Sequence, residues 1–256
     1  MLMLSTKQDA SLSQDTISIG GHGQAKEIIG RFLRNRAAVF GMVVVLFLLF
    51  CAIFPQALTQ YDPIEQNLRD RFAAPSAEHF FGTDEYGRDI FSRVIYGCRT
   101  SMEIGLISVA ISCIIGVVIG AIAGFYGGIT DNLFMRFIDV LMAIPNTLLG
   151  ISIVAALGNS IPNLIIALSI GSIAGYARVV RVSVLSTKGT EYVEAAYATG
   201  ASDFRIIFKY ILPNCLAPII VQATMSVATT IMAATGLSFL GLGVPAPTPE
   251  WGAMAS

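Results

Sequence analysis

The chain has 256 residues, of which 54% are hydrophobic and only 13% are charged, and its mean hydropathy is +0.70. Soluble domains carry about 25% charged residues, so this composition excludes an ordinary soluble globular protein, and it also excludes a disordered chain. The formal net charge is -1, from 16 Lys and Arg against 17 Asp and Glu. This balance gives no electrostatic support for nucleic-acid binding.

Long runs without Asp, Glu, Lys, Arg or His predict membrane-spanning helices; these runs cover residues 37–61, 104–130, 140–177 and 210–249. A helix needs about 20 residues to cross the hydrocarbon core of a bilayer. The third run is too long for one span and is divided by the Gly- and Pro-containing segment 158–162, whereas the fourth run ends in a Pro-rich loop sequence. We therefore predict an all-α polytopic membrane protein with five spans, near residues 37–57, 103–126, 133–156, 163–180 and 213–236.

The distribution of Lys and Arg predicts the orientation of these spans. With the N-terminus in the cytoplasm, 11 of the 16 Lys and Arg residues lie on the cytoplasmic side, which the positive-inside rule favours. The predicted organisation is a cytoplasmic N-terminal segment (1–36), a first transmembrane helix (37–57), an extracytoplasmic loop (58–102) and a helical core (103–256). Five spans would place Ser256 outside, directly after a Pro-rich loop, so we expect that a sixth helix is missing from this sequence.

The outer segment, residues 59–101, is long and amphipathic. Thr83, Asp84 and Gly87 are typical of turns and caps, and residues 88–99 predict a surface helix near the lipid headgroups. Two interpretations remain open, a solvated loop with internal charge pairs and a docking surface for an external partner.

Small residues recur at every fourth position of the second predicted span, which places them on one helix face where another backbone can approach closely; they are Ser108, Ser112, Gly116, Gly120, Gly124 and Gly128. We expect Gly116, Gly120 and Gly124 to pack against a neighbouring helix.

Near the cytoplasmic end of the third span, Arg136 and Asp139 are three residues apart and are expected to form an ion pair on one face, with an ion pathway as the functional alternative.

The cytoplasmic segment 186–213 carries the signals of two short helices. Thr190 is a candidate cap for the first helix, Gly200 is suited to end it in a left-handed conformation, and Ser202 is a candidate cap for a second helix that runs toward Pro213. Such a segment is either a solvated connection between spans or a compact element that docks on a soluble partner.

Segment 186–213 also matches a known family. Glu194-Ala195-Ala196, three residues, Gly200, nine residues and the ending Tyr210-Ile211-Leu212-Pro213 closely resemble the EAA loop of ABC-importer permeases. Residues 82–93, 131–139 and 247–252 resemble the dipeptide, oligopeptide and nickel branch of these permeases, and the resemblance covers about residues 30–256. The chain departs from the pattern at Tyr210, where an isoleucine is usual, and it lacks the sixth span with which relatives continue.

The resemblance implies a type I ABC importer in the bacterial inner membrane. A homologous second permease would complete the path, two cytoplasmic ABC ATPases would drive it, and an extracytoplasmic binding protein would deliver substrate. It also implies a set of residues that couple the permease to the ATPases: Glu194, Ala195, Ala196, Gly200, Leu212 and Pro213. Peptides are the expected substrates, and nickel chelates, glutathione or opines are alternatives.

The residues themselves are those of a passive membrane subunit rather than an enzyme. None of the four lysines follows a glycine, so the sequence has no phosphate-binding P-loop, and ATP is expected to bind to partner subunits. We expect no catalytic, cofactor-binding or metal-ligating residues in this chain. The alternative function is that of a secondary transporter or channel subunit, which would be expected to show intramembrane ionisable residues and internal repeats.

Overall fold

The structure is a computed structural model that describes residue 30 and residues 32–255. The chain divides between Leu49 and Phe50 into two units, and each is described by itself. Apart from an isolated bridge between Thr83 and Asp89, the described residues form helices, turns and loops only. The chain is therefore all-α, as predicted.

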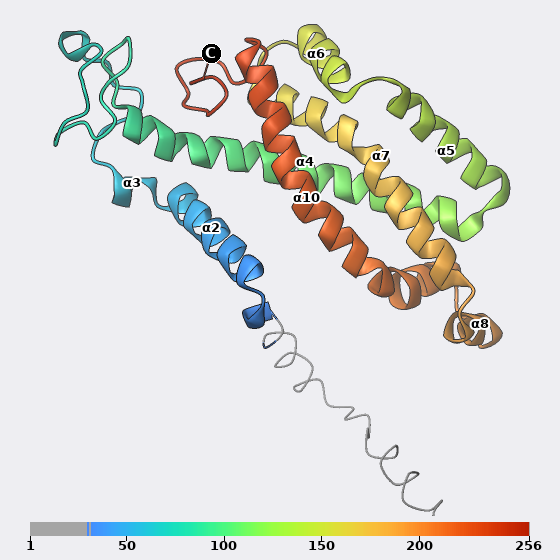
Figure 1. The fold of residues 1–256 in the computed structure, drawn as a ribbon. Coiled ribbons are helices and arrows are strands. Elements are labelled where there is room, and N and C mark those ends of the chain that lie inside the picture. The colour runs from blue at the N-terminus through green and yellow to red at the C-terminus, as the bar shows by residue number, and fades with distance from the viewer. Residues whose placement is uncertain (1–29, 31, 256) are drawn as a thin grey trace, which may run out of the picture. The chain divides into compact units, whose positions relative to one another are not determined.

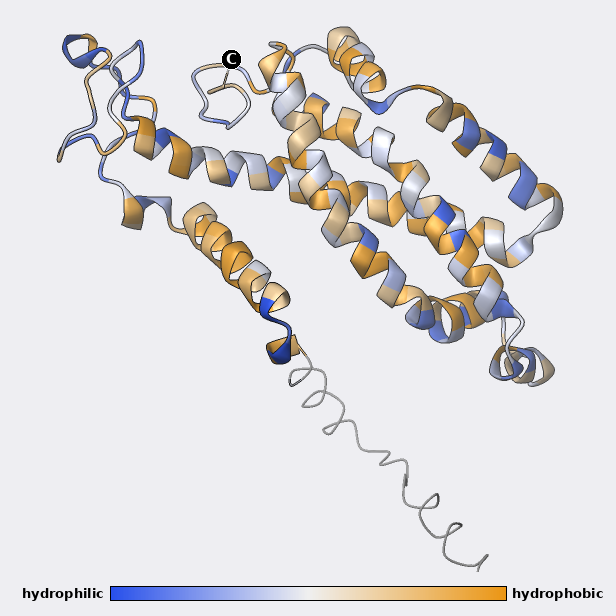
Figure 2. Ribbon diagram, in the orientation of Figure 1, coloured by the Kyte–Doolittle hydropathy of each residue, from blue (hydrophilic) through white to orange (hydrophobic). Residues whose placement is uncertain are grey.

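Four helical stretches of the described chain are long and apolar enough to cross a membrane: α2 (Arg36–Ile53), α4 (Ile90–Tyr126), α7 (Ile161–Lys188) and Asp203–Phe239. The helices α5 (Gly128–Ala143) and α6 (Asn146–Leu157) make a fifth span if they are counted together. The hydropathy colouring shows α2 as an almost uninterrupted apolar helix (Figure 2). It ends earlier than the predicted residue 57, because Phe54 leaves the helical conformation before Pro55, which begins the short helix α3 (Pro55–Leu58).

The helix α4 corrects the prediction of a separate surface helix at residues 88–99. It runs unbroken for 37 residues from Ile90 to Tyr126, and a helix of this length spans about 55 Å. The expected surface helix is therefore the first part of the same helix that forms the second span. Before it, the outer segment is mostly irregular and contains one short 3-10 helix, η1 (Leu68–Asp70).

The third predicted span is also corrected, because α5 and α6 are bent by 86° at a break rather than continuous. Ile144, immediately before Pro145, has φ -94 and ψ 125, which is an extended conformation. Proline disfavours the helical conformation in the residue before it, so the chain leaves the helix at this point. The predicted break at 158–162 is present: α6 ends at Leu157, and Ser160 caps α7 by accepting a hydrogen bond from the backbone of Asn163.

The helices α4 and α7 form the most extensive helix contact in the described chain (Figure 1). Contacts advance in step along both helices, with Gly116 against Tyr176 and Gly124 against Val184, so the two helices run parallel. The segment between them must therefore return to the starting side, and α5 and α6 together make this return.

Two apolar clusters lie at opposite ends of this helix pair. One contains Ile104 of α4, Leu164 of α7 and Leu237 of α10 (Leu212–Phe239). The other contains Phe125 and Val184, and it extends into the segment between α7 and α10. That segment comprises α8 (Glu191–Ala198), α9 (Asp203–Arg205) and η2 (Ile206–Ile211), a π-helix that continues directly into α10.

The predicted second helix of this segment runs toward Pro213 and continues through it into α10. The π-helix η2 immediately precedes α10, and the side chain of Asn214 donates to the carbonyl of Tyr210 at 2.7 Å. A wider turn and a side-chain donor accommodate a proline, which cannot donate a backbone hydrogen bond, so the helix continues through it.

The C-terminal residues fold back on the first part of α4. Trp251 Nε1 donates to the carbonyl of Val94 at 3.1 Å, and Gly97 leaves room for the indole ring. Glu250 is 0% exposed and accepts a hydrogen bond from the hydroxyl of Ser101 at 3.3 Å. The segment after α10 is thus fixed on α4 by buried polar contacts.

Candidate coupling site

The candidate site is the segment 186–213, named here the coupling loop. Its first helix, α8, buries Val193 and Ala196 in the apolar cluster that contains Val184 and Phe125. The opposite face carries Glu191 and Glu194, which are exposed. The helix is therefore held by its apolar face and presents two carboxylates at its first turn, where acidic side chains are favoured by the helix dipole.

The turn after α8 is a Schellman motif at Gly200. This residue has φ +75, its N–H donates to the carbonyl of Tyr197 at 2.9 Å, and the N–H of Ala201 donates to the carbonyl of Ala196 at 3.1 Å. A Cβ on Gly200 would meet no atom within 4 Å. The glycine is therefore required by the backbone conformation, and its surroundings are open to a partner.

Neither of the two residues predicted as helix caps forms a side-chain cap. Thr190 makes no side-chain cap; its hydroxyl donates to the carbonyl of Thr187 at 2.7 Å. Ser202 precedes α9 and likewise makes no side-chain cap.

Burial raises the pKa of the Tyr197 hydroxyl, and the nearby carboxylate of Asp203 raises it further, so this phenol is neutral at physiological pH.

The remaining residues implied by the resemblance differ in exposure. Ala195 lies on the exposed side of α8, whereas Ala196 is buried beneath it. Leu212 is partly buried against the same apolar cluster as Ala196, and Pro213 is exposed at the start of α10. The structure thus gathers these residues around one cluster.

A lysine links the coupling loop to the end of α4. Lys188 Nζ donates to the carbonyl of Phe125 at 2.5 Å and lies 5.5 Å from the centroid of the Phe125 ring. A cation at the last carbonyls of a helix is favoured both by hydrogen bonding and by the helix dipole. The last turns of α4 and α7 are therefore joined just before α8 begins.

The glycines of α4 lie directly against the backbone of α7. A Cβ on Gly116 would overlap the Cβ of Tyr176, a Cβ on Gly120 would overlap the carbonyl oxygen of Ala177, and one on Gly124 would lie 3.0 Å from the carbonyl oxygen of Arg181. Ser108 and Ser112 continue the same buried face of α4. Gly128 does not belong to it, because it begins α5 with φ +54.

The expected ion pair between Arg136 and Asp139 is wrong. Asp139 instead accepts a hydrogen bond from Arg178 NH2 of α7 at 2.6 Å, and no partner for Arg136 appears among the described residues. A second pair joins the same two helices, because Asp131 is bidentate to Arg181, with both distances at 2.5 Å. Since α5 lies alongside α7, its aspartates pair with the arginines of α7 rather than with Arg136 on their own helix.

Arg178 and Arg181 were not predicted as the partners of these aspartates. Arg178 directly follows the charge-free run 140–177, and Arg181 lies three residues further on the same helix face. Two cations at the end of an apolar span require acidic partners on a neighbouring helix, and the acidic positions of residues 131–139 were the available signal.

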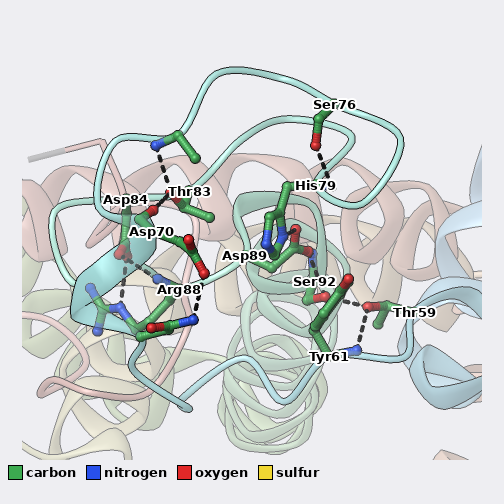
Figure 3. A network of polar contacts seen from close by, with 12 residues as sticks. Thr59, Tyr61, Asp70, Ser76, His79, Thr83, Asp84, Arg88, Asp89 and Ser92 are labelled. Carbon is green, nitrogen blue, oxygen red and sulfur yellow. Dashed lines mark hydrogen bonds and ion pairs between the residues drawn. The ribbon is translucent and has the colours of Figure 1, made fainter.

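Several charged side chains of the outer segment pair with one another (Figure 3). Asp89 caps α4 by accepting hydrogen bonds from the N–H and the hydroxyl of Ser92, both at 2.7 Å, and its carboxylate lies 2.9 Å from His79 Nδ1. Burial acts to raise the pKa of Asp84, but hydrogen bonds from the backbone and guanidinium of Arg88 outweigh it and hold this pKa below its usual value. The internal charge pairs expected for a solvated loop are present, and docking of an external partner remains a prediction.

These features define the class of protein. The described residues are helical with four or five apolar spans and an exposed helix–turn–helix between two of them, which is the architecture of a multi-pass membrane protein. Residues 116–256 match the family model of the binding-protein-dependent transport system inner membrane component, and residues 23–75 match the N-terminal TM domain of oligopeptide transport permease C. The chain belongs to this family of transport permeases.

Curated relatives agree with the family model. The chain is 45% identical over 231 residues to the dipeptide transport system permease protein DppC of Alkalihalophilus pseudofirmus, a match that covers 90% of this chain and 76% of that protein. It is 44% identical over 236 residues to the di/tripeptide transport system permease protein DppC of Pseudomonas aeruginosa, with coverage of 90% and 78%. The oligopeptide transport system permease protein OppC of Bacillus subtilis is 41% identical over 231 residues, with coverage of 90% and 76%.

A solved structure shows the same fold. A chain of the MetNI methionine ABC transporter in an inward-facing conformation superposes with a TM-score of 0.54 at 21% identity, covering 60% of this chain and 77% of that chain. The prediction of a type I ABC permease-like helical bundle is confirmed.

Proposed function

We propose that this chain is the transmembrane permease subunit of an ATP-driven importer of dipeptides or oligopeptides. The observation that carries the proposal is the coupling loop, in which a buried apolar face and a Schellman turn fix an exposed carboxylate, Glu194, and an open backbone position, Gly200. The peptide substrate class is supported by the names of the relatives, which are dipeptide and oligopeptide permeases.

The partners of the proposed importer follow from the family. A second permease completes the path, two cytoplasmic ATPases bind the coupling loops, and a substrate-binding protein docks on the outer side. ATP binds to the ATPases and not to this chain. The N-terminus and the coupling loop lie in the cytoplasm of a bacterium whose inner membrane holds the protein, an orientation supported by the 11 Lys and Arg residues on that side.

In this proposal α8 docks on the ATPase as a preformed element. Glu194 accepts a charge-assisted hydrogen bond from a basic group of the ATPase, and the missing side chain of Gly200 lets the two backbones approach. Movement of the ATPases then reaches the spans through α7, which ends at Lys188, shortly before α8 begins at Glu191.

The test is reconstitution of this chain with its ATPases, sister permease and binding protein. The purified chain alone is expected to hydrolyse no ATP, and the complete assembly is expected to couple hydrolysis to peptide uptake. ATP turnover by the pure chain, or an assembly that moves no peptide, would refute the proposal.

The coupling residues are tested by Glu194→Ala and Gly200→Val at matched membrane levels. Loss of a hydrogen bond to a charged group costs about 1.5–3 kcal/mol, so Glu194→Ala is expected to weaken ATPase binding about 10- to 100-fold. Gly200→Val places a β-branched residue in a left-handed conformation and is expected to disturb the end of α8. The control is Ala198→Ser in the same helix; normal ATPase pull-down and uptake in both test variants would mean that the loop is only a connector.

A further inference from the structure

Two adjoining cavities lie between α7 and α10 beside the break that separates α5 from α6. One has a volume of about 270 Å³ and the other about 380 Å³, and both are lined by Asn146, Gly171, Ser172 and Thr229. Because they share these residues, the two cavities adjoin, and they are named here together the α7–α10 cavity. It has an apolar lobe and a polar lobe.

The apolar lobe is lined mainly by aliphatic side chains, among them Ile151, Leu168, Met232 and Leu237. The polar lobe adds Gln222 and Ser226 to the shared Asn146, Ser172 and Thr229. None of the residues that line either lobe is charged. The cavity therefore offers hydrogen bonds at one end and apolar surface at the other, without selecting for net charge.

Two amide side chains form the centre of the polar lobe. A Cβ on Gly171 would lie 3.6 Å from the amide of Asn146, and a Cβ on Gly175 would lie 3.6 Å from Gln222 Nε2. Each amide thus lies over a glycine of α7, where no side chain of α7 covers it. The absence of these two side chains keeps the polar lobe open.

These amides have hydrogen-bonding capacity to spare. No described residue hydrogen-bonds to the side chain of Asn146, and Gln222 makes one long contact, 3.4 Å from its Nε2 to Ser226 Oγ. The hydroxyls of Ser172 and Thr229, by contrast, donate to carbonyls of their own helices at 3.1 Å. The two amides are therefore the groups that can bind a ligand.

The position of the polar lobe argues against contact with lipid. Gln222 and Thr229 follow the first residue of α10, Leu212, by 10 and 17 residues, which corresponds to about 15 and 26 Å along the helix and hence to the middle of the span. Amides that lack partners are strongly unfavourable in hydrocarbon. The polar lobe is therefore not expected to face lipid.

We propose that the α7–α10 cavity is a contact site for the peptide in transit, in which Asn146 and Gln222 hydrogen-bond to peptide main-chain amides and the apolar lobe takes a substrate side chain. An amide side chain pairs with a peptide group through both its N–H and its C=O, whatever the peptide sequence. Such contacts suit a carrier of peptides with varied side chains. This inference rests on the proposed function and names the residues through which it acts on substrate.

The first experiment measures uptake of trialanine by the complete importer reconstituted in liposomes. Asn146→Leu and Gln222→Leu are each expected to lower the initial rate about two- to tenfold, the range that one hydrogen bond supplies, while assembly with the partner subunits stays normal. Thr224→Val is the control, because Thr224 is exposed on α10 and lines neither lobe. Wild-type uptake in both leucine variants would overturn the inference.

The second experiment needs no change of the amides. In the intact complex, Thr229→Cys is expected to react with a charged methanethiosulfonate reagent above the background of the native cysteines, and trialanine is expected to slow the reaction. Thr224→Cys is expected to react more slowly and to be unaffected by trialanine, because Thr224 lines neither lobe. Equal reactivity of the two cysteines, or no effect of trialanine, would refute the assignment of this cavity, whereas failure of the wild-type importer to move trialanine would refute the proposed function itself.

Discussion

The contact between α4 and α7 predicts that a single methyl group at Gly120 destabilises the protein. A Cβ at this position would overlap the carbonyl oxygen of Ala177 and lie 2.9 Å from Val180 Cβ and 3.0 Å from the backbone nitrogen of Arg181. Two of these three atoms belong to the backbone, so no side-chain rotation relieves the overlap. The helices must separate by up to about 1 Å to restore ordinary contact distances, which loosens the contacts along the whole pair.

The expected cost of Gly120→Ala is about 1–3 kcal/mol of overpacking, less about 1 kcal/mol gained from the better helix propensity of alanine. The matched control is Gly236→Ala in α10, where a Cβ meets no atom within 4 Å and only the propensity gain remains. The assay is thermal unfolding of the detergent-solubilised protein, with Tm expected about 2–10 °C lower for Gly120→Ala than for the control. Equal Tm values for the two variants would show that α4 and α7 do not approach as closely as described.

Three further predictions concern polar contacts. Asp131→Asn is expected to lower Tm more than Asp139→Asn, because the side chain of Asp131 is 15% exposed and bidentate whereas that of Asp139 is 49% exposed and singly bonded; the reverse order would contradict this ranking. The pKa of Asp84 lies below its usual value, so its stabilisation is complete above about pH 4 and is lost as the pH falls through the lower folded value. Limited proteolysis of the outer segment should therefore increase below about pH 4 in the wild type, and should already be high at neutral pH in Asp84→Asn. Glu250→Ala is expected to cost about 1–3 kcal/mol, because it removes the buried carboxylate that accepts hydrogen bonds from the Ser101 hydroxyl and the Ala253 N–H, and Glu250→Gln should be milder in the same unfolding assay.

Charge distribution and local chain chemistry predicted much of the fold. The charge-free runs located α2, α7 and α10, since a span must exclude ionisable side chains from hydrocarbon over its whole length. The break between α6 and α7 followed from glycine and proline, and the end of α8 at Gly200 followed from the demand for a left-handed residue. These features depend on a few neighbouring residues, so they can be predicted from the sequence.

Features that depend on contacts between distant segments were harder to predict from the sequence. The bend at Pro145 was not predicted because it lies within the charge-free run 140–177, in which one proline does not by itself distinguish a kinked span from a broken one. The partner of Asp139 is 39 residues away and depends on how α5 lies along α7. The α7–α10 cavity likewise requires the packing of three helices, which no spacing rule in one segment encodes.

The fit of glycines on α4 to side chains on α7 fixes the register of the two helices. Gly116, Gly120 and Gly124 face Tyr176, Val180 and Val184 in turn, so each bulky residue occupies the gap left by one glycine. A shift of α7 along α4 by less than a full turn would drive these side chains into the neighbouring ridges. We therefore expect α4 and α7 to move as one rigid unit. Conformational change during a transport cycle is then expected in the segments that connect this pair to the other helices, at the 86° bend between α5 and α6 and at the π-helix η2 before α10.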